Sequence, residues 1–390
     1  MPIKPCIAKE ENYLITLRRW FHARPEPSLQ EFETYKKIAS ELDALGIPHQ
    51  KIGDTGIAAT IRGEKPGTGK VIALRADMDA LSLDDLKTVP YASKNPGYCH
   101  ACGHDVHMAA LLGAAKVLQE KRAEFAGEVR LFFQQAEEIG GGAKHFIAAG
   151  LLDGVHRVFG GHVIPTMDVG TVGIGGGPRN ASSDYFKIDV KGRSAHAATP
   201  DKGVDALYIA AQIVTNLQAI VARNTHPIDS VLVSVGKLNA GTQYNSLADS
   251  AVIEGTTRAF TPEIRTRTNE TVRRIAEGTT HMFGGTADVT IKHFAPPLIN
   301  DYAAAKEALE IATPIVGVSH IRTNYAKALW ADDFADFLEH VKGVYVLIGA
   351  KNPASTSPPA ALHHGMFDVD EKALLTFCNL YVDFALHYMD

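Results

Sequence analysis

The sequence predicts an α/β protein with two domains: a mainly parallel sheet covered by helices, and an inserted domain of the order β-α-β-β-α-β. Three observations support this prediction. A chain of 390 residues is too long for one ordinary core, so two domains are expected. Strand and helix patterns alternate through the first half, which indicates a mainly parallel sheet with helices on both faces. The pattern changes near residue 182 and changes back near residue 295.

The first domain is predicted to comprise residues 1–181 and 295–390. Residues 12–25 and 33–47 have the apolar spacing of amphipathic helices. Residues 107–121, "HMAALLGAAKVLQEK", form a third helical pattern, which directly follows a cluster of cysteines and histidines. This domain is therefore expected to place helices on both sides of its sheet.

Three apolar runs of the first domain are typical of buried strands. They span residues 69–79, 127–138 and 157–163, and each ends in aspartate, glutamate or histidine. In sheets of this kind functional groups gather at the carboxyl ends of the strands. We therefore expect the functional site at this edge of the sheet.

The inserted domain is predicted to span residues 182–294, a common domain size. Its strand patterns fall at 184–192, 230–239, 250–260 and 287–294, and its helix patterns at 203–224 and 262–284. This order is that of ferredoxin-like domains, in which helices cover one antiparallel sheet.

Composition excludes several function classes. The formal charge of −5, without a run of lysine or arginine, gives no footprint for nucleic acid. No apolar run reaches the length of a membrane span, and the N-terminus lacks the apolar core of a signal peptide, so we expect a cytoplasmic protein. Four cysteines in a chain of this size do not form a disulfide framework.

The segment "CHACGHDVH" admits two interpretations. Cys99 and Cys102 have the CxxC spacing of a redox pair, but no thioredoxin-sized βαβ pattern surrounds them. Alternatively, Cys102 and His104 alternate on an extended segment, so that both can bind one metal ion. Asp105 and His107 begin the next helix and could orient such ligands by hydrogen bonding. The crowding of histidines around the cysteines favours the metal site.

Further candidates follow two other strands and precede the last helix. Glu137 and Glu138 form a solvated acidic turn in one interpretation; in the other, one binds metal and its neighbour takes a proton from water. His162 follows two glycines, and His363 and His364 precede the final helix. A lone histidine is more often packed or solvated than a ligand. Several such elements in one predicted domain nevertheless favour a metal centre.

Motifs spread over nearly the whole chain resemble those of one family. They are "RADMDAL", "PYASKNPG", "HACGHDVH", "QQAEE…GGGA", "GGHV", "GTVGIGGGP", "VKGRSAHAA" and "LHHGMFDVDE". The chain thus resembles the aminoacylase and hippurate hydrolase family of dinuclear metallopeptidases. Its members include amidohydrolases that act on N-acyl amino acids, hippurate and auxin–amino acid conjugates.

The resemblance implies two divalent metal ions per subunit, Zn²⁺ or Mn²⁺, bridged by the thiolate of Cys102. His104 and His162 would complete one site, and Glu138 and the C-terminal histidine the other. In the family the C-terminal ligand directly follows a leucine or a similar residue, which favours His363. Cys99, where relatives often carry methionine, would then be a packing residue.

The resemblance also implies roles outside the metal ligands. Glu137 matches the general base, and Asp77 matches an aspartate that orients a histidine ligand. His196 matches a histidine that reaches the active site of the partner subunit. Asn245 and Arg258 match polar positions that face the substrate, although an exposed polar residue and a surface salt bridge are their ordinary interpretations.

The expected function is therefore a metal-dependent amidohydrolase that cleaves N-acyl or N-aroyl amino acids, with Glu137 as general base. A dipeptidase or aminopeptidase with the same dinuclear core is the alternative within enzymes. A sensor with structural metals and a thiol oxidoreductase are alternatives from other classes. The inserted domain resembles the family's lid and dimerisation domain, so a homodimer is expected. The acyl group and the amino acid stay open.

Overall fold

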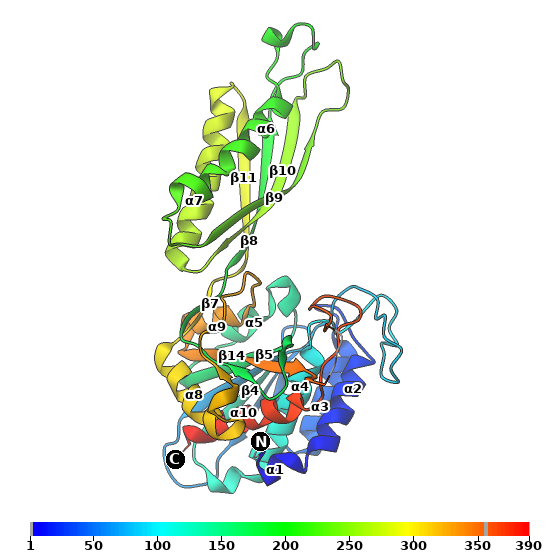
Figure 1. Ribbon diagram of the computed structural model, residues 1–390, viewed down its shortest axis with the longest axis vertical. Helices are drawn as coiled ribbons and strands as arrows, with labels where there is room; N and C mark the ends of the chain where they lie inside the picture. Colours follow the sequence, from blue (N-terminus) through cyan, green and yellow to red (C-terminus); the bar gives the residue numbers. More distant parts are fainter. Residues whose placement is uncertain (1–2, 355–357, 390) are drawn as a thin grey trace. The chain divides into compact units, whose positions relative to one another are not determined.

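The computed structural model describes residues 3–354 and 358–389. These residues form an eight-stranded, a four-stranded and a two-stranded sheet with helices packed on them (Figure 1). The predicted α/β class, with a mainly parallel sheet and an inserted β-α-β-β-α-β segment, is confirmed. No helix in the described part of the chain is both long enough and apolar enough to cross a bilayer.

The contacts within the chain divide it into two units. Unit 1 comprises the chain up to Gly177, Asn300–Ala326 and the chain from Asp332 onward, and unit 2 comprises Pro178–Ile299 and Lys327–Ala331. The sequence analysis assigns the short segment Lys327–Ala331 to the first domain. It belongs to unit 2 because the backbone of Ala328 bonds to the residues on either side of Asn180. Sequence spacing does not reveal such a single bridge.

The large sheet of unit 1 has the order β1-β2-β4-β3-β5-β14-β6-β13. Its strands are β1 (His49–Ile52), β2 (Gly56–Arg62), β3 (Val71–Asp77), β4 (Glu128–Gln134), β5 (Val155–Asp168), β6 (Val172–Gly173), β13 (Ile321–Arg322) and β14 (Gly343–Lys351). The central strands β4, β3, β5 and β14 are parallel. β1 and β2 pair antiparallel at one edge. The parallel centre places the ends of β3 and β4 side by side.

One strand of this sheet differs from its prediction. The sequence analysis ends the third strand near His162, but β5 continues to Asp168 because it pairs with β14 that far. On its other side β5 pairs with β3 only as far as Phe159. His162 therefore lies within a strand, at a point where the neighbour on one side has already ended.

Helices cover both faces of the large sheet (Figure 1). The helices of unit 1 are α1 (Pro5–Ala8), α2 (Glu11–His22), α3 (Phe32–Ala44), α4 (His104–Glu120), α5 (Gly142–Ala148), α8 (Tyr302–Val316), α9 (Phe334–His340) and α10 (Ala373–His387). A side chain at Gly160 would meet Phe334 of α9, and one at Gly161 would meet Phe377 of α10. Successive residues of a strand point to opposite faces, so α9 and α10 lie on opposite sides of the sheet.

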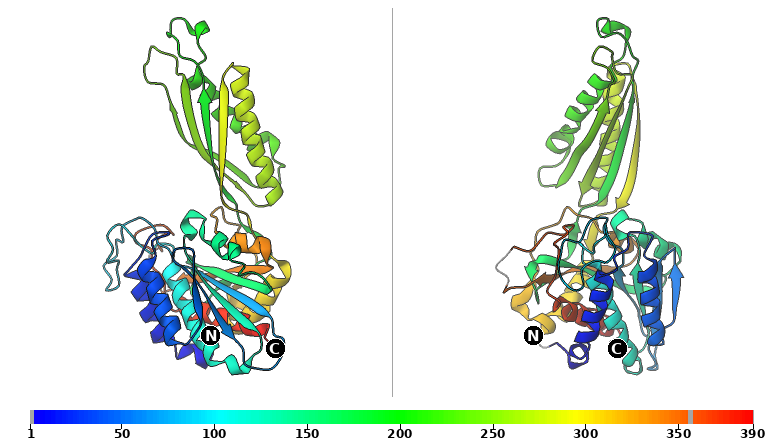
Figure 2. Two further views of the ribbon diagram at one scale, coloured as in Figure 1. Left: turned by 180° about the vertical axis from the view of Figure 1, so that it is seen from behind. Right: turned by 90° about the vertical axis from the view of Figure 1, so that its right-hand side faces the viewer.

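Unit 2 is a four-stranded antiparallel sheet of the order β11-β8-β10-β9 with two helices (Figure 2). Its elements are β8 (Ser183–Lys191), α6 (Ala206–Leu217), β9 (Val231–Ala240), β10 (Ser250–Ala259), α7 (Pro262–Met282) and β11 (Thr286–Ala295). Every second residue of β8, from Phe186 to Val190, is buried against apolar residues of α6 and α7. This period-two pattern explains why both helices cover the same face. The strands β7 (Gly177–Asn180) and β12 (Leu298–Asn300) form the two-stranded sheet.

Candidate metal centre

The loop before α4 brings Cys102 and His104 to the carboxyl end of β3. Gly103, between them, has a φ of 91°, in the left-handed region that side chains rarely adopt. A Cβ atom there would also lie 2.3 Å from the side chain of Val163 in β5. Glycine thus lets the loop approach β5 closely, and α4 begins immediately afterwards, at His104.

Cys102, His104 and His162 form the first group of candidate ligands, with ligand atoms within 4.8 Å of one another. His162 Nε2 lies 3.3 Å from Cys102 Sγ. His104 donates its Nδ1 proton to the Asp79 carbonyl at 2.8 Å, and His162 donates its own to the Val163 carbonyl at 2.7 Å. These bonds fix the tautomer of both rings and leave Nε2 as the ligand atom.

Cys102, Glu138 and His363 form the second group, again within 4.8 Å. His363 Nε2 lies 3.4 Å from Cys102 Sγ and 3.6 Å from Glu138 Oε2. The backbone N–H of His363 donates to the Ala101 carbonyl at 2.9 Å, and its φ of 62° turns the ring toward the thiol. Cys102 thus belongs to both groups, and its thiolate would help to hold an ion in each of them.

The structure also separates the two neighbouring C-terminal histidines. His363 joins the second group, whereas His364 accepts the backbone N–H of Met366 on its Nδ1 at 3.1 Å. The His364 ring therefore takes part in the local turn. Of the two, His363 is the residue whose ring nitrogen meets the other candidate ligands.

Glu137 lies directly beside these groups. It opens a short 3-10 helix, Glu137–Ile139, and its Oε2 is 3.9 Å from His104 Nε2. Burial, Asp332 and Glu138 raise the pKa of Glu137 well above its ordinary value. Both consecutive glutamates lie near His104, with Glu138 Oε1 3.8 Å from its Nε2, and Glu138 also belongs to the group of Cys102 and His363. The pair is therefore not a solvated acidic turn.

The donor set fits divalent metal ions. His104 Nε2 and Glu138 Oε1 are buried and lack a hydrogen-bond partner among the described residues. Burial, then Glu138 and Glu137, raise the pKa of the Cys102 thiol well above its ordinary value. Burial lowers the pKa of His104, but Asp77 and Asp79 outweigh this effect and raise it to about 10. Several buried anionic groups around orphaned donor atoms provide what a cation with sulfur, nitrogen and oxygen ligands requires.

Asp77 contacts a histidine, but not one of the predicted ligands. Its Oδ1 accepts the Nδ1 proton of His107 at 2.6 Å, whereas His104 Nδ1 is 3.8 Å away. His107 Nε2 accepts the backbone N–H of Val163 at 3.1 Å. Asp77 is therefore linked through His107 to the backbone next to His162, while the Asp79 carbonyl orients His104. The resemblance implies a histidine ligand beside Asp77 without saying which one; in the structure the hydrogen-bonded partner of Asp77 is His107, which lies on the same helix as His104.

Asp105 and Cys99 lie away from the candidate ligands. Asp105 accepts hydrogen bonds from Arg18 Nε at 2.8 Å and from His22 Nδ1 at 2.7 Å, so it does not orient a predicted ligand. Cys99 is buried 3.9 Å from Lys87 Nζ, and burial raises the pKa of its thiol to about 12. All four cysteines of the chain are free thiols in the structure.

Two further carboxylates, from distant parts of the chain, hold the loop after β4. Asp79 Oδ2 accepts the backbone N–H of Glu138 at 3.0 Å. Asp333 Oδ2 accepts the N–H groups of Gly142 and Ala143 at 3.1 Å each. The sequence analysis noted Asp79 only as an acid after a strand and did not single out Asp333. Its segment "ADDFADF" carries no spacing that relates it to the loop.

The three other predicted site residues belong to unit 2. His196 is exposed, and its segment pairs with that of Asn245 through a bond from the Ala197 N–H to the Asn245 carbonyl at 3.0 Å. Arg258 lies on β10, half-buried, and burial lowers its pKa. The structure thus brings His196 and Asn245 onto neighbouring segments of one unit.

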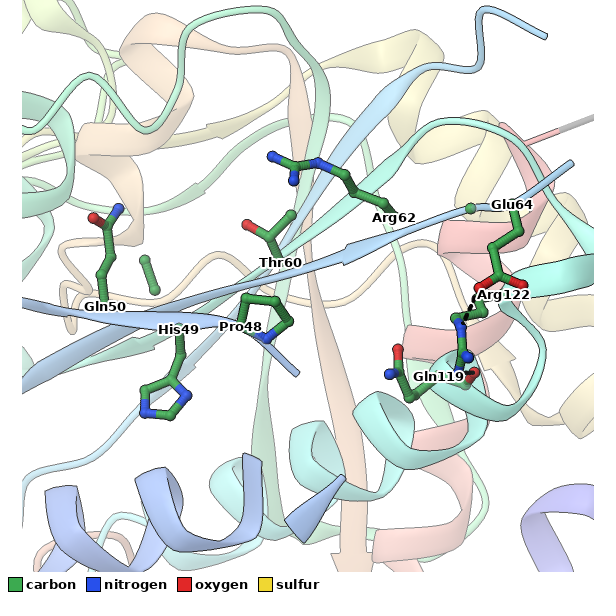
Figure 3. A pocket seen from close by; sticks show the side chains of 10 residues that line it. Pro48, His49, Gln50, Thr60, Arg62, Glu64, Gln119 and Arg122 are labelled. Carbon is green, nitrogen blue, oxygen red and sulfur yellow. Dashed lines mark hydrogen bonds and ion pairs between the residues drawn. The ribbon is translucent and has the colours of Figure 1, made fainter. Parts of the chain in front are cut away.

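A surface pocket of about 480 Å³ lies elsewhere in unit 1 (Figure 3). β1, β2 and the end of α4 line it, and an ion pair of 2.7 Å between Arg122 and Glu64 lies at one side. None of its lining residues belongs to the predicted site. Its position at the edge of the sheet separates it in the fold from the strand ends that carry the candidate ligands.

Comparisons with known proteins identify the family. The model of peptidase family M20/M25/M40 matches residues 73–387. An N-acetyl-L-cysteine deacetylase of Bacillus subtilis (strain 168) is 40% identical over 374 residues, which cover 94% of this chain and 85% of that protein. An N-acyl-L-amino acid amidohydrolase of Geobacillus stearothermophilus is 39% identical over 300 residues, 76% of this chain and 80% of that protein.

A solved structure agrees with these matches. The crystal structure of a dinuclear metal-binding peptidase of the M20 family from Bacillus subtilis superposes with a TM-score of 0.82 at 35% identity, covering 98% of this chain and 99% of that one. The resemblance inferred from the motifs is thereby confirmed, and so is the class of enzyme, a hydrolase of amide or peptide bonds. The chain belongs to peptidase family M20/M25/M40.

Proposed function

We propose that this chain is a two-metal amidohydrolase that cleaves N-acyl or N-aroyl amino acids into the acid and the free amino acid. The observation that carries the proposal is the shared position of Cys102. Its sulfur meets His162 at 3.3 Å and His363 at 3.4 Å, so one thiolate serves two ligand groups. A single structural metal would not require the second group.

Each of the two ligand groups would bind one metal ion. Cys102, His104 and His162 would hold one ion, and Cys102, Glu138 and His363 the other. When bound, a pair of divalent ions supplies an activated water and polarises the scissile carbonyl. The hydrogen bonds from the His104 and His162 rings to backbone carbonyls hold both rings in the ligating tautomer.

Glu137 is the proposed general base. Its carboxylate adjoins both groups without belonging to the bridging set, and it lies 3.9 Å from His104 Nε2. It would accept the proton of the attacking water and pass it to the leaving amine. His196 would stabilise the developing oxyanion. Glu137 would thus act as the base while Glu138 binds metal. A site with a purely structural metal would not need the additional carboxylate of Glu137.

The substrate class is proposed from unit 2 and from the relatives. The Arg258 side chain is half-buried and has no hydrogen-bond or ion-pair partner among the described residues. The Asp184 carboxylate acts on it only through its charge, so the guanidinium is available for an external anion. Arginine and asparagine suit a free carboxylate, which Arg258 would bind as a bidentate donor with Asn245 beside the substrate. The relatives named for N-acetyl-L-cysteine and for N-acyl-L-amino acids support this class.

A substrate panel tests the proposal. Acetyl, benzoyl and indole-acetyl amino acids are assayed beside dipeptides and beside the matching carboxamides, which lack the negative charge. We expect hydrolysis of the acids, poor hydrolysis of the carboxamides and a loss of kcat/KM in Arg258→Ala. Equal hydrolysis of acids and carboxamides, with Arg258→Ala unchanged, would exclude the carboxylate anchor. A preference for dipeptides would favour the dipeptidase alternative.

The identity of the metal is part of the proposal. Thiolate and imidazole ligands suit Zn²⁺, whereas the carboxylate and the family also admit Mn²⁺. Activity of the metal-free protein after addition of each ion distinguishes the two. A thiolate ligand requires a reducing environment, which agrees with the proposed cytoplasmic location.

We also propose a homodimer in which His196 acts in the partner subunit's site. Among the strands of the described residues, β9 is an edge strand of the unit 2 sheet and pairs with β10 alone. Open edges are sites of pairing between chains. Mixing Glu137→Gln and His196→Ala chains should restore activity in heterodimers, which carry one intact composite site. No recovery despite subunit exchange measured by mass would contradict the shared site.

A further inference from the structure

The backbone turns sharply just before Glu137. Ala136 follows the end of β4 with φ 55° and ψ 38°, the left-handed region that an alanine rarely adopts. This conformation is unfavourable for a residue with a Cβ atom and persists only where the surrounding structure holds it. Since Ala136 directly precedes the proposed base and metal ligand, its conformation sets where both side chains begin.

One buried carboxylate holds this residue. Glu31 Oε1 accepts the backbone N–H of Ala136 at 2.9 Å, and Glu31 is 0% exposed. Its other oxygen, Oε2, accepts the hydroxyl proton of Thr55, which is also buried. The backbone of Glu31 is itself fixed, because its carbonyl accepts the N–H of Tyr35 in the first turn of α3. The carboxylate is thus anchored at both ends.

Other carboxylates bind the rest of the loop after β4, so the hydrogen bond of Glu31 to Ala136 can be considered separately. Asp79 binds the N–H of Glu138, and Asp333 binds the N–H groups of Gly142 and Ala143. Among the hydrogen bonds of the described chain, only that of Glu31 holds the N–H of the left-handed residue itself. The Ala136 carbonyl accepts the Gly141 N–H at 3.2 Å, so loss of the Glu31 bond would leave the rest of the loop anchored while the N–H side of Ala136 becomes free to leave its strained conformation.

We propose that Glu31 is a positioning residue, which holds Ala136 in the left-handed conformation and thereby aims Glu137 and Glu138 at the metal centre. The inference rests on the proposed function of the site. It assigns a role in hydrolysis to a residue that touches neither substrate nor metal, about a hundred residues before the loop in the chain.

Substitutions at Glu31 and Thr55 separate positioning from packing. Glu31→Leu removes the acceptor and should lower kcat about 10- to 100-fold with little change of KM, the range for a lost bond to a charged group. Glu31→Gln keeps one acceptor for Ala136 and one donor for Thr55, so it should stay within about threefold of the wild type. Thr55→Val is the matched control, because it removes the other bond of the carboxylate and leaves the Ala136 bond in place.

A second-site substitution gives the decisive readout. Glycine adopts positive φ without strain, so Ala136→Gly removes the need for an anchor. The double variant Glu31→Leu, Ala136→Gly should therefore regain at least about threefold in kcat over Glu31→Leu. A merely structural role of Glu31 predicts no recovery, because the glycine adds only backbone freedom to a destabilised protein. Should Glu31→Leu fail to fold, Glu31→Met, with a more adaptable apolar side chain, replaces it.

Amide hydrogen exchange of the metal-free protein tests the same inference without activity. The peptide that contains Ala136 should be protected in the wild type and in Thr55→Val, and should lose protection in Glu31→Leu. Equilibrium titration of Zn²⁺ should show weaker binding of the ion that needs Glu138, with the other ion unchanged. A wild type that cleaves no acyl amino acid would overturn the proposed function alone. Unchanged exchange and unchanged kcat in Glu31→Leu would overturn the role of Glu31.

Discussion

His104 and Asp105 are consecutive at the start of α4, yet they belong to two buried regions with different charge balance. We call the first the Cys102 cluster: Cys102, His104, Glu137, Glu138, His162 and His363. The second is the Arg18 cluster: Arg18, His22, Asp105, Asp368 and Glu371. Both bury carboxylates in unit 1. They differ in what neutralises those carboxylates.

The Arg18 cluster is neutralised by the chain itself. Arg18 is 0% exposed and binds Asp105 and Asp368 at 2.8 Å each. Burial opposes ionisation of Asp105, but Arg18 and His22 outweigh it, and the pKa of Asp105 falls well below its ordinary value. Buried charges persist where they are paired and hydrogen-bonded. The charges of this cluster are therefore balanced within the chain, although Asp105 Oδ1 and His22 Nε2 have no hydrogen-bond partner among the described residues.

The Cys102 cluster is not neutralised in this way. No lysine or arginine among the described residues forms an ion pair with Glu137 or Glu138, and burial raises the pKa of Glu138 to about 7. The Cys102 cluster therefore lacks the arginine partner that compensates the buried carboxylate of Asp105 in the Arg18 cluster. We infer that the buried charge of Glu137 and Glu138, beside the unpartnered ring nitrogen of His104, favours the binding of external cations at the Cys102 cluster.

The largest effect is expected from breaking the Cys102 cluster itself. Cys102→Ser or His363→Ala should lose bound metal together with hydrolysis, because each removes a ligand of the second group. Cys99→Ser is the matched control, since Cys99 lies outside the cluster and should keep both. Metal content by mass spectrometry and the rate of hydrolysis are measured on the same samples. A Cys102→Ser protein that retains full activity without metal would contradict the proposal that the Cys102 cluster binds the metal ions required for hydrolysis.

The next largest effect separates the two adjacent glutamates. Glu137→Gln should keep the metals and the fold while kcat falls by roughly 10²–10⁴, the range for a lost general base. Glu138→Gln should instead weaken metal binding, because Glu138 meets His363 and Cys102. Kinetics and metal titration of both variants distinguish the roles. Reversed phenotypes would show that the assignment of the neighbours is wrong.

A smaller effect is expected when the Arg18 cluster is broken. Arg18→Leu leaves Asp105 buried without its cation and should lower the free energy of unfolding by about 3–5 kcal/mol, with metal content unchanged. Arg19→Leu, on the same helix, removes a partly exposed ion pair with Glu371 and should cost about 0–1 kcal/mol. Denaturant unfolding of both variants tests this difference. Equal destabilisation would contradict the distinction between buried and exposed pairs.

The smallest effect concerns pH. The groups that face Asp105 are Arg18, His22 and His100, and they keep its folded-state pKa below the unfolded value of about 3.9. At low pH the unfolded state then binds more protons, so the stability contributed by Asp105 is present above about pH 4 and is lost as the pH falls. The difference in unfolding free energy between the wild type and Asp105→Asn should therefore shrink by about 1 kcal/mol between pH 6 and pH 3. A difference in unfolding free energy that does not change with pH would contradict the lowered pKa of Asp105 in the folded state.

The sequence predicts the parallel strands well for a physical reason, whereas the metal ligands stay a prediction. Apolar periodicity marks the strands, and a buried strand that ends in acids marks an active edge, so β3 and β4 lie where they were expected. The ligands around Cys102 are carried by short motifs whose residue types can serve few other purposes together. β14 was not predicted, and its pairing extends β5 past His162.

The parts that escaped prediction depend on contacts between distant segments. His104 and Asp105 are both polar and adjacent, and only the direction of α4 decides which one meets the metal centre. Glu31 and Asp333 reach the loop after β4 from opposite ends of the chain, and both are single acids without a periodic pattern. The sequence likewise did not indicate which histidine Asp77 would contact, and in the fold it is His107. Such residues become visible only when the fold brings their segments together.

The central claim is that the Cys102 cluster binds two divalent ions through one shared thiolate and that hydrolysis depends on both. The most direct test is titration of the metal-free protein with Zn²⁺ or Mn²⁺, with bound metal and hydrolysis of an N-acyl amino acid measured at each step. The account predicts saturation at about two ions per chain, with activity complete only at the second equivalent. Full activity of the metal-free protein, or saturation at one ion with full activity, would contradict it.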